Sequence, residues 1–133
     1  FSLLQRGHPI IRKRISTMKA EETALTIISA EEQIRGRLNI IRRANSSNEI
    51  VLAYQRLRDC LDDLRNINLL DFTSDASVVY DDLVRQRIRI GTRDLRIAAI
   101  SLTVKGILVT RNQGDFEKIP GLPFEDWSVE IRS

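Results

Sequence analysis

The stretch GTRDLRIAAI at residues 91–100, followed by ILVTRNQGDF at residues 107–116, decides the fold of this chain. It places Asp94 at the start of an alanine-rich segment with helical periodicity and Asp115 just after a short apolar strand. A helix that packs back on its own strand forms a right-handed crossover in a parallel sheet. Both carboxylates are therefore expected near the carboxyl edge of that sheet, where α/β folds bind their ligands.

Strand and helix signals alternate along the rest of the chain. Apolar runs at residues 25–28, 67–72 and 107–110 are typical of buried strands, and segments with helical periodicity lie between them. Strands that alternate with helices predict an α/β fold with a parallel sheet. At this length the whole chain, residues 1–133, is expected to form a single domain.

Signals for helix ends accompany these runs. A helix is expected to start at Ser29 or Ala30, and SSNE at residues 46–49 is a capping box that opens the next one. Those two helices are expected to form a hairpin. Asp75 is expected to cap the helix after the second strand, and Gly106 to end the alanine-rich helix.

Composition limits the classes of chemistry that this chain can perform. Apolar residues make up 42% and charged residues 29%, which is typical of a soluble globular protein. No apolar run approaches the ~20 residues that span a bilayer, and no signal peptide is visible, so a cytoplasmic setting is expected. Cys60 and His8 are each the only residue of their type, which argues against disulfides, cysteine zinc sites and nucleophile–histidine pairs. Any chemistry is expected to depend on carboxylates.

Basic residues are concentrated in the first third of the chain, although the net charge is only +3. Such a concentration would favour a polyanion through counterion release, and most of these charges taken singly are expected to be solvated surface. The residues concerned are Arg6, Arg12, Lys13, Arg14, Arg35, Arg37, Arg42 and Arg43.

Three acidic residues share one sequence context. Glu32, Asp94 and Asp115 each follow a strand or loop and are expected at or within the first turn of a helix. Most carboxylates so placed only cap amides and complement the helix dipole. Three of them at one sheet edge would repel each other unless protonated or bridged by a cation, and oxygen ligands favour Mg²⁺ or Mn²⁺. Such ions activate a water molecule for attack on a phosphodiester bond.

A family resemblance becomes specific at these residues. The segments concerned are residues 27–36, 92–99, 109–116, 119–122 and 125–127, and they resemble the PIN-domain ribonucleases of the VapC toxin type. The resemblance implies a three-layer fold, with a central parallel sheet flanked by helices. It also implies a metal-dependent endoribonuclease toxin that hydrolyses RNA, is inhibited by a cognate antitoxin protein and forms a homodimer.

The resemblance assigns roles to five residues. Glu32, Asp94 and Asp115 match the family's acidic positions, and Asn112 and Thr110 match polar positions beside the last acid. Asp94 and Asp115 are expected to bind Mg²⁺ or Mn²⁺, and Glu32 to bind metal or position water. Asn112 is expected to orient the site. Thr110 is expected to contact the residues that bind the metal, although a threonine at a strand end is more often structural.

The chain departs from the family pattern at its start. The family's Asp-Thr-Asp/Asn motif is absent before Phe1, so the central first strand and the first metal-binding aspartate are expected to be missing. The slot between residues 25–28 and 107–110 would then be filled by upstream residues or by another chain. Residues 1–133 alone are expected to be weakly active or inactive as a nuclease. The alternative is a catalytically inactive PIN-fold module that binds RNA or an antitoxin-like protein.

Overall fold

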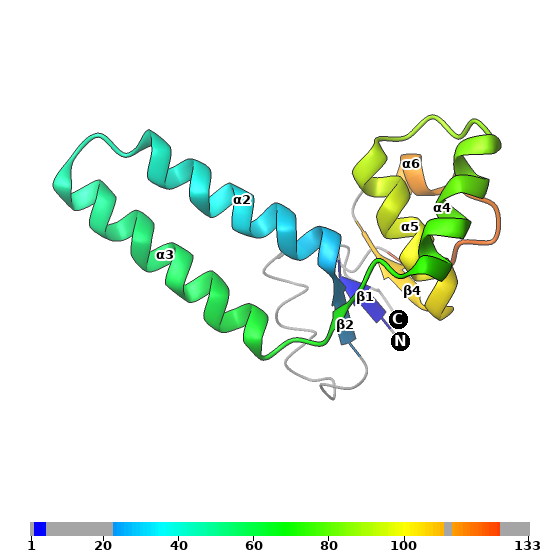
Figure 1. Ribbon diagram of the computed structural model, residues 1–133, viewed down its shortest axis with the longest axis horizontal. Helices are drawn as coiled ribbons and strands as arrows, with labels where there is room; N and C mark the ends of the chain where they lie inside the picture. Colours follow the sequence, from blue (N-terminus) through cyan, green and yellow to red (C-terminus); the bar gives the residue numbers. More distant parts are fainter. Residues whose placement is uncertain (1, 5–22, 111–112, 126–133) are drawn as a thin grey trace, which may run out of the picture.

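The computed structural model describes residues 2–4, 23–110 and 113–125, which form a parallel sheet covered by helices (Figure 1). In this part of the chain, five parallel strands lie in the order β3-β2-β1-β4-β5. The elements are β1 Ser2–Leu4, β2 Thr23–Thr26, α2 Ile27–Arg43, α3 Ser47–Arg65, β3 Leu69–Leu70, α4 Ser74–Arg85, α5 Thr92–Val104, β4 Ile107–Val109, α6 Gln113–Phe116 and β5 Phe124–Glu125. The α/β class and the parallel sheet predicted from the sequence are confirmed.

The central position of the sheet is occupied by β1. Leu3 pairs with Ala24 of β2 on one side and with Leu108 of β4 on the other. The expectation that the central strand is absent from this chain is therefore wrong, because Ser2–Leu4 fills the slot. The physical reason is that an empty slot would leave two rows of buried backbone groups without hydrogen-bond partners.

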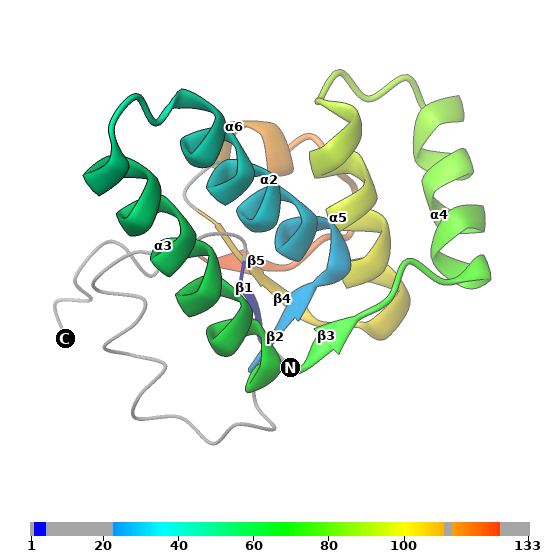
Figure 2. The ribbon, with the colours of Figure 1, turned by 60° about the vertical axis from the view of Figure 1, so that its left-hand side comes forward.

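Helices cover both faces of the sheet, as two adjacent residues of β4 illustrate. Leu108 packs in a core with α4, α5 and α6, whereas Val109 packs in a second core with Leu25, Cys60 and Leu64. Neither Leu108 nor Val109 has any solvent exposure. Because successive strand residues point to opposite faces, the two cores lie on opposite sides of the sheet. Figure 2 shows the strands between the α2–α3 pair and the α4–α5 pair, which confirms the three-layer arrangement.

Helices α2 and α3 form the predicted hairpin, which projects from the sheet (Figure 1). The β2 strand ends at Thr26, earlier than the predicted residue 28, because the Thr26 side chain caps α2. The capping box before α3 is confirmed in part. Ser46 Oγ accepts a hydrogen bond from the backbone N of Glu49 at 3.1 Å, but the Glu49 carboxylate accepts from the N of Asn45 at 2.7 Å.

Two predicted helix ends differ from the structure. Thr73 caps α4 in place of Asp75, since its Oγ1 accepts a hydrogen bond from the N of Ala76 at 3.1 Å. Lys105 takes the left-handed conformation at the end of α5, with φ 55° and ψ 40°, one residue before the expected Gly106. None of the helices in the described ranges combines the length and apolar content needed to cross a membrane.

Candidate active site

Three connections bring the predicted acids to the carboxyl edge of the sheet. Strand β2 leads directly into α2, which carries Glu32, and β4 leads through Thr110 toward α6, which carries Asp115. Helix α5 connects to the start of β4 by a tight turn, so its first turn, with Asp94, lies at the same edge. All three acids are partly buried. The placement predicted from the sequence is thus found for Asp94 and Asp115, whereas Glu32 lies in the second turn of its helix, because α2 begins at Ile27 and not at Ser29 or Ala30.

An ion pair joins two of these elements. Arg93 Nε lies 3.3 Å from Glu32 Oε2, with 45% of the arginine side chain and 26% of the glutamate side chain exposed. Arg93 immediately precedes Asp94 in the first turn of α5. The pair therefore anchors α2 to α5 at the point where the predicted site lies. No periodicity or spacing in the sequence pointed to Arg93.

A second cation lies beside Asp115. Lys118 Nζ is 3.6 Å from Asp115 Oδ1, and it also donates a hydrogen bond to the backbone carbonyl of Arg89 at 3.3 Å. Because Lys118 follows α6 and Arg89 precedes α5, this hydrogen bond links the turn after α6 to the segment that leads into the first turn of α5. Glu32 and Asp115 therefore each lie close to a cation of the same chain.

Buried hydroxyl groups line the inner side of this edge. Thr110 is 1% exposed, and its backbone N donates a hydrogen bond to the carbonyl of Glu125 at 2.9 Å, which fixes the end of β4. Thr26 and Ser29 are fully buried where β2 passes into α2. Asn112, which was predicted to orient the site, lies outside the described residues.

The donor atoms suit a hard cation, but they do not form a closed cluster. Carboxylate oxygens such as those of Glu32, Asp94 and Asp115 are the ligands that Mg²⁺ and Mn²⁺ prefer. Within residues 2–4, 23–110 and 113–125, no group of three His, Cys, Asp or Glu side chains is placed to hold a metal ion. Metal binding by these acids therefore stays a prediction.

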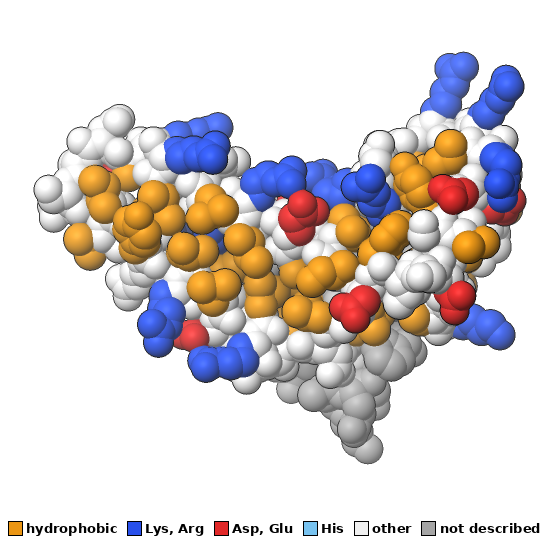
Figure 3. Space-filling model, viewed as in Figure 1, with side chains coloured by type: hydrophobic (Ala, Val, Ile, Leu, Met, Phe, Trp, Pro, Cys, Tyr) orange, Lys and Arg blue, Asp and Glu red, His pale blue; other side chains and the backbone are white. Residues whose placement is uncertain are grey.

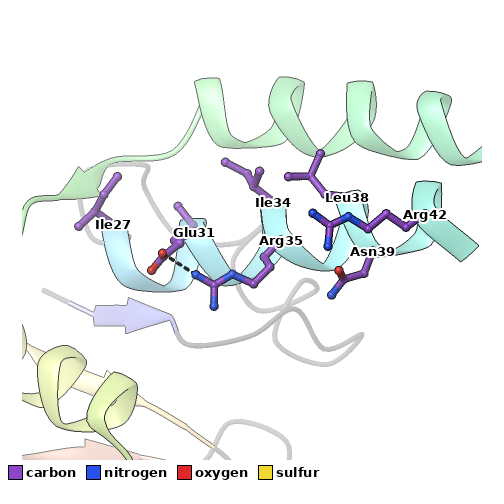
Figure 4. Close-up of a pocket in the computed structure, with 8 residues that line it drawn as sticks. Ile27, Glu31, Ile34, Arg35, Leu38, Asn39 and Arg42 are labelled. Carbon is purple, nitrogen blue, oxygen red and sulfur yellow. Dashed lines mark hydrogen bonds and ion pairs between the residues drawn. The ribbon is translucent and has the colours of Figure 1, made fainter.

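A groove along α2 is a second feature that the sequence did not indicate. Its cavity has a volume of about 550 Å³ and is lined by Ile27, Ala30, Glu31, Ile34, Arg35, Leu38, Asn39 and Arg42. Figure 4 shows two of its apolar side chains, Ile34 and Leu38, pointing toward α3, and Ile27 pointing toward the chain that follows α3, while Glu31, Arg35 and Asn39 lie along the other side. Apolar side chains also spread over the hairpin surface in Figure 3.

Comparison with known proteins finds similar sequences, although no protein-family model matches the chain. Ribonuclease VapC of Rickettsia bellii is 33% identical over 88 residues, which cover 56% of this chain and 66% of that protein. Ribonuclease VapC1 of Rickettsia felis is 48% identical over 44 residues, which cover 33% of each protein. The chain thus matches between a third and about two thirds of the length of these relatives.

Solved structures share the fold over nearly the whole chain. VapBC-1 from nontypeable Haemophilus influenzae has a TM-score of 0.72 and 22% identity, covering 96% of this chain and 98% of that one. A toxin-antitoxin complex from Klebsiella pneumoniae has a TM-score of 0.67 and 19% identity, covering 92% of this chain and 95% of that one. In sequence the chain is thus similar to the VapC ribonucleases, and in fold it is similar to the VapBC structures.

Proposed function

We propose that this chain is the catalytic domain of a metal-dependent endoribonuclease toxin. The observation that carries the proposal is the placement of Glu32, Asp94 and Asp115 on three elements that meet at one edge of a parallel sheet. Similarity to proteins named Ribonuclease VapC supports RNA as the substrate. An enzyme of this kind would act in the cytoplasm.

Each residue contributes through its position at the edge. Asp94 and Asp115 would hold a Mg²⁺ or Mn²⁺ ion, and Glu32 would bind the metal or orient the attacking water. Asn112 would orient the site through hydrogen bonds, and Thr110 would keep the end of β4 in place. When bound, the metal would supply a water of lowered pKa and would neutralise charge on the phosphodiester.

A protein inhibitor and a second copy of the chain are the proposed partners. The names VapBC and toxin-antitoxin complex of the fold neighbours support an antitoxin as inhibitor. The α2 groove, with Ile27, Ile34 and Leu38 in its lining, offers an apolar surface on which a partner segment could pack. A homodimer is proposed on the family resemblance alone.

A second candidate function is a catalytically silent module that binds RNA or an antitoxin-like protein. The ion pairs at Glu32 and Asp115 favour it, because a cation of the chain already neutralises part of the charge that would attract a metal. In the part of the chain that the structure describes, no three acids are gathered around one point. Cleavage assays separate the two functions.

The test is RNA cleavage by the purified protein in Mn²⁺ and in EDTA. We expect slow cleavage in Mn²⁺, none in EDTA and none with Asp94→Asn. Asp62→Asn is the control, since Asp62 lies near the end of α3, which leads into the start of β3 at the opposite edge of the sheet. RNA binding without cleavage at any metal concentration would favour the silent module. Cleavage that survives Asp94→Asn would contradict the role of the acids.

A further inference from the structure

We infer that Arg93 is a built-in counter-ion of the active site, which holds Glu32 and competes with a divalent cation for its carboxylate. This inference rests on the proposed function and names a regulatory element of the same site. Arg93 Nε and Glu32 Oε2 are 3.3 Å apart, and the glutamate is mostly shielded from water, with 26% of its side chain exposed. An ion pair at this depth is screened less than one on the open surface.

The placement of this pair sets it apart from ion pairs along the helix surfaces. Arg35 and Glu31 lie one helical turn apart on α2, with 66% and 57% of their side chains exposed. Such pairs contribute little to stability and position nothing else. Arg93 and Glu32 instead lie on different helices, and Arg93 is adjacent in sequence to Asp94. The guanidinium therefore holds Glu32 of α2 to the turn of α5 that carries Asp94.

A guanidinium and a divalent cation that bind one carboxylate repel each other, so each weakens the binding of the other. Metal binding at Glu32 would therefore displace the Arg93 side chain. The displaced guanidinium would remain at the first turn of α5, beside Asp94, where it could bind a phosphate of the RNA. A planar guanidinium binds phosphate oxygens through paired hydrogen bonds, so Arg93 would then contact the RNA backbone. Arg93 is thus a positioning residue for Glu32 before metal binds and a phosphate contact afterwards.

Calorimetric titration with Mn²⁺ alone tests the competition without measuring activity. Arg93→Gln removes the competing charge, and we expect it to raise the affinity for Mn²⁺ about three- to tenfold. Arg93→Lys keeps the charge and is expected to stay close to the wild type. The matched control is Arg58→Gln, because Arg58 forms an ion pair with Asp62 on α3 and its side chain is 78% exposed.

The phosphate contact has its own readout in binding of a 2′-deoxy oligonucleotide that cannot be cleaved. In Mn²⁺, Arg93→Gln is expected to weaken binding and to reduce the dependence of log affinity on log salt by about 0.7. A Mn²⁺ affinity of Arg93→Gln equal to or below that of the wild type, including no detectable binding by either, would overturn the inference. RNA cleavage is measured separately, so loss of the proposed function is distinguishable from loss of this competition.

Discussion

The side chain of Thr26 and the backbone of Ser29 form the junction between the sheet and the helix that carries Glu32. Thr26 Oγ1 accepts a hydrogen bond from the N of Ser29 at 3.1 Å, and both residues are fully buried. The Thr26 hydroxyl in turn donates to Ser29 Oγ at 3.2 Å. Because the strand ends and the helix begins within this one turn, the junction sets the orientation of the first turns of α2 relative to the sheet.

Replacing Thr26 with valine should destabilise the protein by about 1–3 kcal/mol. Valine matches the shape of threonine but removes the hydroxyl, which leaves the amide and hydroxyl of Ser29 without this buried partner. Urea denaturation measures the free energy of unfolding. Thr26→Ser keeps the hydroxyl and should lower the free energy of unfolding less than Thr26→Val does. An equal decrease in the two variants would show that the hydrogen bonds contribute little.

Truncation of Ile97 should destabilise the core beneath α5. Ile97 has no solvent exposure and packs in the cluster that contains Leu108 and Phe116. Ile97→Ala is expected to lower the free energy of unfolding by about 2–5 kcal/mol, since it leaves a cavity. Val78→Ala on α4 is the control. Val78 is 65% exposed, so this change should lower the free energy of unfolding by well under about 1 kcal/mol. Similar losses at the two sites would contradict the assignment of the core.

Glycine at position 105 should stabilise the protein. Lys105 ends α5 with a φ of 55°, a conformation that is unfavourable for residues with a Cβ atom and favourable for glycine. Lys105→Gly is expected to raise the free energy of unfolding by about 0.5–1 kcal/mol. The neighbouring Val104→Gly, inside the helix, should have the opposite effect. A lower melting temperature for Lys105→Gly would show that the left-handed turn is not formed.

Short-range patterns explain why the sequence predicts the fold class and the positions of the acids. Asp94 lies in the first turn of α5 and Asp115 in α6, as expected, because the strand and helix signals around them are local. The helix cap at residues 73–75 was ambiguous, since Thr73, Ser74 and Asp75 all favour capping positions. Thr73 has the extended backbone of a cap residue, with φ −81° and ψ 172°, and the sequence does not show this.

Features that depend on contacts between distant segments could not be predicted. Ser2–Leu4 is too short for its sequence alone to predict the central strand. Its pairing with β2 on one side and β4 on the other places it there. Likewise, the Arg93–Glu32 pair joins two helices whose packing is a property of the whole sheet. The α2 groove also arises only when the helices are assembled.

The Lys118–Asp115 ion pair should contribute little to stability, in contrast to Thr26 and Ile97. Both side chains are substantially exposed, at 51% and 37%, and they lie one helical turn apart. Lys118→Met is therefore expected to change the free energy of unfolding by less than about 1 kcal/mol. Chemical denaturation in low and in high salt checks this, and a loss of several kcal/mol would mean that the link from Lys118 to the Arg89 carbonyl organises the site.

Paramagnetic line broadening by Mn²⁺ tests most directly whether Glu32, Asp94 and Asp115 form one metal site. In nuclear magnetic resonance spectra, substoichiometric Mn²⁺ should broaden the amide signals around all three acids together and spare the hairpin tip near Ser47. Asp94→Asn should abolish this broadening, because it removes one of the few charged ligands. Broadening that is centred elsewhere, or that is unchanged in Asp94→Asn, would contradict a shared site at the carboxyl edge of the sheet.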